Sequence, residues 1–165
     1  DLTSRIGDDG RRTEVSVNRS VAMPNGGLDF SLGVVDQEGD SSLRPRGSVS
    51  YRRDTRRGGL TASLTQEPSI DGTSVYSNTS IDVDYTESIN NLSEWSAGVV
   101  FVAANDIGGP DDDSRATAEV SYSRSLTDEW RMRAGVQHIL EDEGGTTERS
   151  NSVFFSIERD VTFGF

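Results

Sequence analysis

The sequence predicts an all-β protein in which antiparallel strands follow one another up and down. Apolar and polar residues alternate with a period of two along much of the chain, which is the pattern of strands with two unlike faces. No segment shows the 3.6-residue stripe of an amphipathic helix. About nine strands are expected, at residues 13–21, 28–35, 46–52, 59–65, 74–86, 95–104, 115–124, 130–140 and 153–165.

The individual strands differ in how clearly they alternate. Segment 28–35 (LDFSLGVV) puts Leu, Phe, Leu and Val on one face, whereas segment 74–86 (SVYSNTSIDVDYT) puts Asn, Ser and two Asp residues on one face. The most apolar run, AGVVFVAA at 97–104, is far shorter than the roughly 20 residues that a membrane helix needs. Most of the strands have the length, roughly 9 to 11 residues, that crosses a bilayer at a tilt.

The connections between the predicted strands are of two kinds that alternate. An up-and-down meander produces this alternation when its two ends face different surroundings. Short connections are expected at 22–27, 53–58, 87–94 and 125–129, and longer, acidic, glycine-rich ones at 36–45, 66–73, 105–114 and 141–151.

The composition limits the class of protein. With 165 residues, a single domain over 1–165 is expected. The net charge of −12 argues against a nucleic-acid partner, which requires a basic surface, and the absence of cysteine excludes disulfides and thiolate metal sites. Only 32% of the residues are hydrophobic, which is little for a domain that buries a core.

Aromatic residues gather at one level of the predicted meander, next to the short connections. Tyrosine and tryptophan prefer the boundary between apolar tails and water, so such a row is typical of an interfacial girdle. The predicted girdle consists of Tyr51, Tyr85, Trp95, Tyr122, Trp130 and Phe163.

The polar face of the strands carries many charges, and this raises the question of which face is inside. A β-sandwich turns its apolar faces inward, whereas a membrane barrel turns them to lipid and encloses the polar ones. Alternation alone does not decide between them, but the aromatic row, the two kinds of connection and the final Phe favour an antiparallel up-and-down transmembrane β-barrel. The pore-lining candidates are Arg46, Arg52, Asp82, Asp84, Glu119, Arg131, Arg133, Glu158 and Asp160.

The closing segment, VFFSIERDVTFGF at 153–165, resembles the C-terminal strand of Gram-negative outer-membrane β-barrel proteins. Apolar residues alternate, an aromatic residue (Phe163) stands third from the end, and the last residue is Phe165. The resemblance implies an assembly signal formed by Phe165, Phe163 and Val161, which the barrel-assembly machinery reads. It also implies a place in the outer membrane, with the lipid bilayer and lipopolysaccharide as surroundings. Arg159 interrupts the apolar face, and we expect it to reach toward an interface or face a neighbouring subunit.

The number of strands is left open by the sequence. Both termini of such barrels normally lie at the short-turn side, so the strand count is even. Residues 1–12 therefore suggest the stump of a preceding strand and loop. The alternatives are eight strands, ten with a short first strand, or the C-terminal part of a larger barrel, which we favour. Other barrel chains in a homo-oligomer are a further source of strands.

No catalytic site is predicted. The one histidine, His138, lies near Glu141 and Asp142, but a Ser-His-acid hydrolase also needs a serine directed at the imidazole. The closely spaced His and Ser of outer-membrane lipid hydrolases are missing, so such an enzyme is only a remote alternative. Asp82 and Asp84 share one face, and we interpret them as part of a salt-bridged interior.

Three charged connections are candidate binding sites. The acidic segments GGPDDDS (108–114) and LEDEGG (140–145) lack the spacing of a twelve-residue calcium loop, so neither a metal nor a cofactor is expected. The segment RRDTRRG (52–58) gathers four arginines around one short turn, where they could contact anionic lipid head groups or a periplasmic partner.

The functional expectation is a porin-like channel for passive diffusion of small polar solutes. In a narrow barrel the inward charges form a packed ladder of ion pairs, and in a wide one they create a field across a pore. The alternatives are a non-conducting barrel that serves as a membrane anchor or an assembly or adhesion platform, and a secreted β-sandwich adhesin module.

Overall fold

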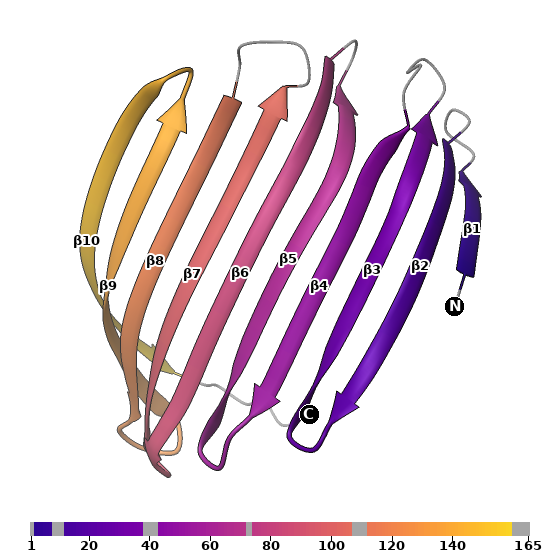
Figure 1. Cartoon of the computed structure of the whole chain (residues 1–165). Helices are drawn as coiled ribbons and strands as arrows, with labels where there is room; N and C mark the ends of the chain where they lie inside the picture. The colour runs from indigo at the N-terminus through magenta and orange to yellow at the C-terminus, as the bar shows by residue number, and fades with distance from the viewer. Residues whose placement is uncertain (1, 8–11, 38–42, 72–73, 107–111, 160–165) are drawn as a thin grey trace, which may run out of the picture.

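The computed structural model describes residues 2–7, 12–37, 43–71, 74–106 and 112–159, and these form one antiparallel sheet (Figure 1). Its ten strands lie in chain order, so the predicted all-β, up-and-down arrangement is confirmed. The strands are β1 (Leu2–Gly7), β2 (Arg12–Met23), β3 (Gly26–Gln37), β4 (Arg44–Asp54), β5 (Gly58–Asp71), β6 (Ser74–Asn90), β7 (Ser93–Asp106), β8 (Asp112–Ser125), β9 (Trp130–Glu143) and β10 (Thr146–Arg159).

The strand β1 is the element that the nine predicted strands leave out. It pairs with the first half of β2, where Leu2 lies opposite Val17 and Gly7 lies opposite Arg12. The expected count of about nine is therefore one too low, because six residues give too short a pattern to be recognised as a strand. The sheet has ten strands, an even number, and its first strand is short, as in the predicted alternative of ten strands with a short first strand.

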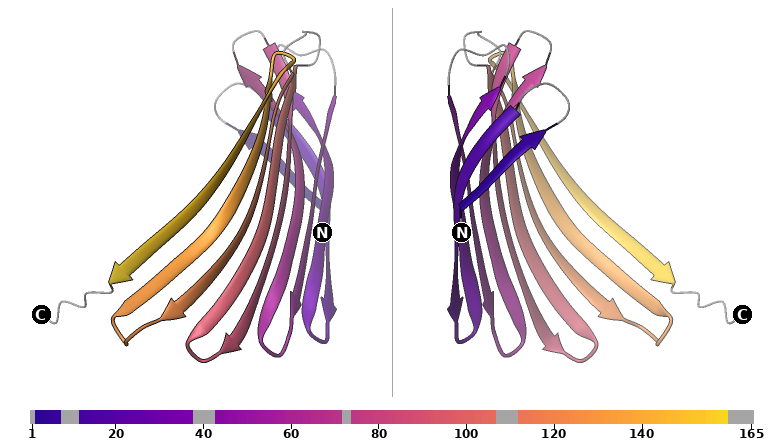
Figure 2. Two further views of the ribbon diagram at one scale, coloured as in Figure 1. Left: turned by 90° about the vertical axis from the view of Figure 1, so that its left-hand side faces the viewer. Right: turned by 90° about the vertical axis from the view of Figure 1, so that its right-hand side faces the viewer.

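The sheet is open. Its edges are β1 and β10, and no pairing joins them among the residues that the structure describes. Figure 2 shows a curved surface whose strands lie close together at the end of the β9–β10 turn and spread apart at the opposite end. The predicted closed barrel is thus not seen within this chain, because the curvature leaves β1 and β10 apart.

The two faces of the sheet differ sharply in chemistry. The register places Tyr85, Ala97 and Val120 in one continuous row, so the apolar residues of neighbouring strands share a face. The opposite face, which we call the polar face, carries mainly Ser, Thr and charged residues. The residues of the apolar face include Val15, Val17, Leu28, Phe30, Leu32, Val34, Val49, Leu60, Leu64, Ile81, Val83, Val99, Phe101, Val120, Val136, Val153, Phe155 and Ile157.

Within the described ranges, no second layer covers the apolar face. Leu32 is 64% exposed, Val99 is 47% exposed and Phe155 is 64% exposed. Among the described residues, the one buried hydrophobic side chain is Val35, which lies on the polar face. A β-sandwich would bury Leu32, Val99 and Phe155 together, so the sheet has the exposure pattern of a surface that still needs an apolar environment.

Two predicted long connections turn out to be mostly strand. β5 continues to Asp71, and β9 and β10 leave only Gly144 and Gly145 between them. Both glycines have positive φ (56° and 80°), as a two-residue hairpin turn requires. Polar and acidic residues here did not end the strands, because backbone pairing does not require apolar side chains. Short and long connections therefore alternate less strictly than the composition suggests.

Candidate functional site

An aromatic row crosses the apolar face of the sheet. Trp95 lies opposite Tyr122, and the ring centroids of Tyr85 and Trp95 are 5.1 Å apart. The Tyr122 hydroxyl donates a hydrogen bond to Ser93 Oγ at 3.0 Å. Five of the predicted girdle residues, Tyr51, Tyr85, Trp95, Tyr122 and Trp130, lie on this face, whereas Phe163 lies outside the described residues, as do Val161 and Phe165 of the predicted assembly signal.

The aromatic row does not follow the hydrogen-bonded register but drifts across it. The cross-strand partner of Tyr51 is Ala62 on β5. The same register row continues through Val83 on β6 and Val99 on β7 to Ala118 on β8. The aromatic residue of β8 is Tyr122, four residues further (122 − 118) after four strands, which is one residue per strand.

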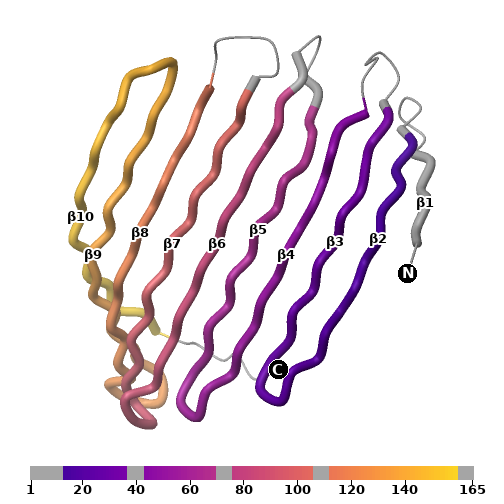
Figure 3. The backbone as a smooth tube through the Cα atoms, in the orientation of Figure 1, coloured from indigo at the N-terminus to yellow at the C-terminus, as the bar shows by residue number. Residues whose placement is uncertain are grey.

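This drift fixes the tilt of the strands against the aromatic level. One residue of about 3.3 Å for each strand spacing of about 4.8 Å corresponds to a tilt of about 35°. Strands in closed barrels tilt by about 35 to 45°. All strands lean the same way in Figure 3, so a level surface through the aromatic residues cuts the whole sheet obliquely.

On β7 and β8, an apolar band separates the aromatic row from a second, polar boundary. Ten residues separate Trp95 from Asn105 (105 − 95) on the apolar face of β7, and ten separate Tyr122 from Asp112 (122 − 112) on β8. At the tilt above, ten residues rise about 27 Å. The apolar band of a membrane barrel is about 25 Å tall. The height and the tilt therefore agree with one bilayer crossing.

Arg159 is held at the aromatic level. Its guanidinium forms an ion pair with Glu129 at 2.7 Å and lies over the Trp130 ring, 5.5 Å from the centroid. Glu129 belongs to the β8–β9 turn, so the charge is drawn to the end of the sheet rather than left in the apolar band. This is the arrangement of a side chain that reaches toward an interface.

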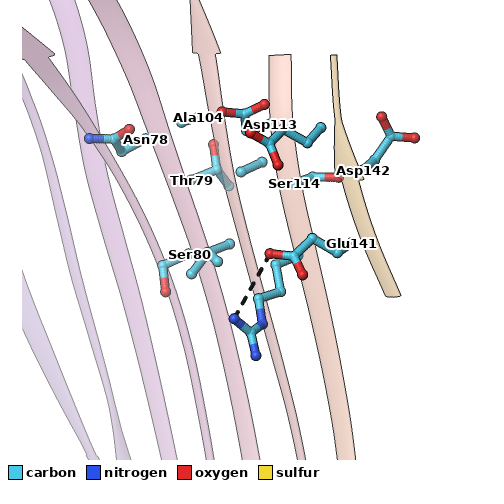
Figure 4. Close-up of a pocket in the computed structure, with 12 residues that line it drawn as sticks. Asn78, Thr79, Ser80, Ala104, Asp113, Ser114, Glu141 and Asp142 are labelled. Atoms are coloured by element: carbon cyan, nitrogen blue, oxygen red, sulfur yellow. Dashed lines mark ion pairs between the residues drawn. The ribbon is translucent and has the colours of Figure 1, made fainter. Parts of the chain in front are cut away.

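The polar face is the hollowed side of the sheet. A depression of about 510 Å³ lies across β6 to β9 and is lined by Asn78, Ser80, Asp113, Arg115 and Glu141 among others (Figure 4). A second, of about 370 Å³, is lined by Arg52, Thr61 and Asp84. The predicted pore-lining residues Arg46, Arg52, Asp82, Asp84, Glu119, Arg131, Arg133 and Glu158 all lie on this face, and Asp160 lies outside the described residues.

The Arg46 guanidinium links three strands across the polar face. It contacts Glu14 of β2 at 2.5 Å and Glu67 of β5 at 2.7 Å. To reach Glu14 it passes over β3, where its register partner is Gly33. Because Gly33 has no side chain, the arginine can lie flat over the strand. This role of Gly33 could not be predicted from the sequence, because it depends on the pairing register of β3 and β4.

Removing the Arg46 charge tests this network. Arg46→Gln removes the cation that joins Glu14 to Glu67, and we expect the free energy of unfolding to fall by about 1 to 2 kcal/mol. Urea titration of the folded protein in detergent measures the change. The matched control is Arg52→Gln, because Arg52 and its partner Asp54 have side chains 69% and 55% exposed and should contribute little. Equal losses in both variants would contradict the network.

A second cluster joins β8 and β9. The Arg133 guanidinium lies 2.6 Å from Glu119 and donates to the buried Ser121 hydroxyl at 3.2 Å. Ser121 also exchanges a hydrogen bond with Ser96 at 2.8 Å. The predicted lining residues Glu119 and Arg133 are thus brought together, and the buried Ser121 and the half-buried Ser96 support them. The predicted set of pore-lining residues did not include these two serines, although both occupy polar-face positions in the alternating pattern of their strands.

Asp82 and Asp84 are not salt-bridged, contrary to the prediction. Neither carboxylate forms an ion pair with any described residue. Their cross-strand neighbours on the polar face are small or apolar: Ser63 and Val100 for Asp82, and Thr61 and Gly98 for Asp84. Arg46, Arg52, Arg115 and Arg133 of this face are paired with nearer acids, which explains the difference.

His138 has a side-chain partner on the neighbouring strand. It lies on the apolar face, where its Nδ1 is 2.7 Å from Asn151 Oδ1 on β10. Across the described ranges, no group of three or more acidic or histidine side chains is arranged to hold a metal ion. Nor does any helix of this part of the chain have the length and apolar character needed to cross a membrane.

Comparison with known proteins gives no relative from which a function could be taken. Neither family models, nor curated proteins, nor solved structures produced a match to the chain. The functional argument therefore depends on the faces, the tilt and the charges described above.

Proposed function

We propose that this chain forms part of the wall of an outer-membrane β-barrel whose water-filled interior passes small polar solutes by passive diffusion. The observation that carries the proposal is the exposed apolar band on one face, about 27 Å tall and bounded by an aromatic row at a tilt of about 35°. An exposed apolar surface that includes Leu32, Val99 and Phe155 is typical of a membrane or protein interface, and the aromatic row at its boundary favours the membrane.

The free edges of β1 and β10 support a barrel with more than ten strands. An unpaired strand edge is not tolerated in lipid, because water is absent and each open N–H or C=O group costs several kcal/mol. Strands from elsewhere in the polypeptide or from other chains would pair with these edges. Barrels of 16 to 18 strands leave an aqueous channel, whereas about eight strands are filled by side chains.

The lining of the polar face favours a channel over a filled interior. Across the centre of this face the residues are small hydroxyl-bearing or glycine residues, which leave room for water, and include Ser48, Ser50, Thr61, Ser63, Thr65, Ser80, Ser96, Gly98 and Thr117. Charged side chains interrupt this lining in separate clusters. Opposite charges along such a wall select solutes by size and charge.

A non-conducting anchor is the second candidate, and the ion pairs favour it. Glu14, Arg46 and Glu67 bridge β2 to β5, and Glu119 joins Arg133 on the same face. In a narrow barrel such pairs would fill the interior. Planar-bilayer recording separates the two candidates, because stepwise currents support the channel and silence at high protein concentration supports the anchor.

Tryptophan fluorescence tests the membrane position itself. Trp95 and Trp130 are the two tryptophans of the chain and both belong to the aromatic row. In vesicles of brominated phospholipid, we expect bromines near the glycerol to quench this emission more strongly than bromines near the acyl-chain ends. Emission that is insensitive to every brominated lipid would show that the sheet stays in water.

A further inference from the structure

The turn between β4 and β5 is an ordered platform at the end of the sheet that holds the aromatic row. Thr55 N donates to Gly58 O at 2.9 Å, which closes the turn. Asp54 N donates to Asn25 O of the β2–β3 turn at 2.7 Å, and Ser88 N of β6 donates to Arg57 O at 2.7 Å. The backbone of the turn is thus fixed to the elements on both sides.

This turn presents three arginines without a protein partner. Arg53, Arg56 and Arg57 are exposed, and their guanidinium groups form no ion pair with any residue in the described ranges. In contrast, the neighbouring Arg52 points to the polar face and pairs with Asp54 at 3.1 Å. Three positive charges on a fixed backbone are available for an anion.

A hollow beside the turn combines cationic, polar and apolar groups. Its volume is about 480 Å³, and it is lined by Arg56, Arg57, Ser88, Ile89, Asn90 and Asn91. The guanidinium groups, the hydroxyl and the amides can donate hydrogen bonds to phosphate oxygens. Ile89 is 50% exposed and offers an apolar surface to the same space. A free anion needs no such surface, whereas a lipid head group with its glycerol does.

The depth of the hollow agrees with a lipid phosphate. Gly58, which follows Arg57, lies opposite Glu87, and Glu87 is two residues nearer this end of β6 than Tyr85 of the aromatic row. The hollow therefore lies just beyond the aromatic row, where the apolar band ends and head groups begin. On the apolar face and in the turns at this end, the described carboxylates are fewer than the arginines: they are Glu87, Asp128 and Glu129, against Arg53, Arg56, Arg57, Arg124 and Arg159.

We propose that Arg56 and Arg57, with Ser88, Asn90 and Asn91, bind the phosphate of an anionic phospholipid in the leaflet at this end of the sheet. The proposal rests on the membrane position proposed above. The lipid is defined by its chemistry: one phosphodiester with net negative charge, and an acyl-glycerol portion against Ile89. Arg53 extends the positive rim next to the site on the apolar face.

Spin-labelled lipids test the site in the full protein reconstituted in phosphatidylcholine bilayers. The motionally restricted fraction of spin-labelled phosphatidylglycerol gives its affinity relative to spin-labelled phosphatidylcholine. We expect Arg56→Gln with Arg57→Gln to lower this relative affinity by about fivefold or more, because each arginine at a lipid surface contributes about a factor of five. Arg115→Gln with Arg149→Gln, which removes the same charge at the other end of the sheet, should leave it unchanged.

Three outcomes would overturn the inference. Equal relative affinity in the turn variant and the unaltered protein would remove the site. Displacement of the labelled lipid by millimolar inorganic phosphate would make it a site for free phosphate rather than lipid. If the tryptophan emission shows that the sheet stays outside the bilayer, the membrane position fails as well. A sheet that enters the bilayer but shows no arginine-dependent preference overturns the lipid site alone.

Discussion

Replacing Val99 with Arg is expected to lower the stability of the protein in a bilayer by about 2 to 4 kcal/mol. Val99 lies on the apolar face between Trp95 and Asn105, near the middle of the apolar band. An arginine there cannot reach either boundary without distorting the bilayer, so most of the desolvation cost remains. Urea titration of the protein folded in phospholipid vesicles, followed by tryptophan emission, measures the change.

The next residue along the strand supplies a matched control. Val100 has the same side chain as Val99 but lies on the polar face, opposite Asp82 of β6 and Thr117 of β8. Val100→Arg should therefore change stability by less than about 1 kcal/mol, because the new charge lies in water beside a carboxylate. If the two variants behaved alike, or if Val99→Arg were neutral, the apolar face would not be in lipid.

Neutralising Asp82 and Asp84 is expected to weaken a preference for cations. Among residues whose side chains are described, the polar face carries seven more carboxylates than arginines (13 − 6). The arginines are Arg44, Arg46, Arg52, Arg115, Arg131 and Arg133, and the carboxylates are Glu14, Asp29, Asp54, Glu67, Asp82, Asp84, Glu94, Asp113, Glu119, Glu141, Glu143, Glu148 and Glu158. A wall with this excess concentrates cations in a conducting barrel.

The reversal potential under a potassium chloride gradient measures this preference. For Asp82→Asn with Asp84→Asn, we expect the ratio of potassium to chloride permeability to fall roughly two- to fivefold at low salt, and less at 1 M, where charges are screened within about 3 Å. The control, Glu87→Gln with Asp142→Asn, removes the same charge from the apolar face and should leave the ratio nearly constant. Chloride preference in the unaltered protein would contradict the charge argument.

The division into two faces was readable from the sequence because the side-chain period of a strand is two. It was readable even at the AGVVFVAA run, where Val99 and Val100 are alike, because the neighbouring strands alternate clearly and fix the register. The aromatic row was predictable for the same reason. Its drift of one residue per strand was not, because the drift depends on pairings between strands that no local pattern encodes.

The strand ends and the ion pairs were harder to predict. β10 begins at Thr146 rather than 153, because pairing with β9 continues through polar residues outside the apolar band. The sequence offered enough arginines to neutralise Asp82 and Asp84, but Arg46 and Arg133 lie closer to other carboxylates. Which acid an arginine reaches depends on the register and on gaps such as Gly33, and composition does not contain that information.

The burial of only one hydrophobic side chain, Val35, among the described residues has a consequence for biogenesis. In water, a one-layer sheet gains less from the hydrophobic effect than a two-layer fold does to offset the conformational entropy lost on ordering. If the sheet enters a bilayer as proposed, the polypeptide would therefore acquire much of its stability only there. Its secondary structure and its delivery into the bilayer would then be acquired in a single step, and lipid would act as the missing half of its interior.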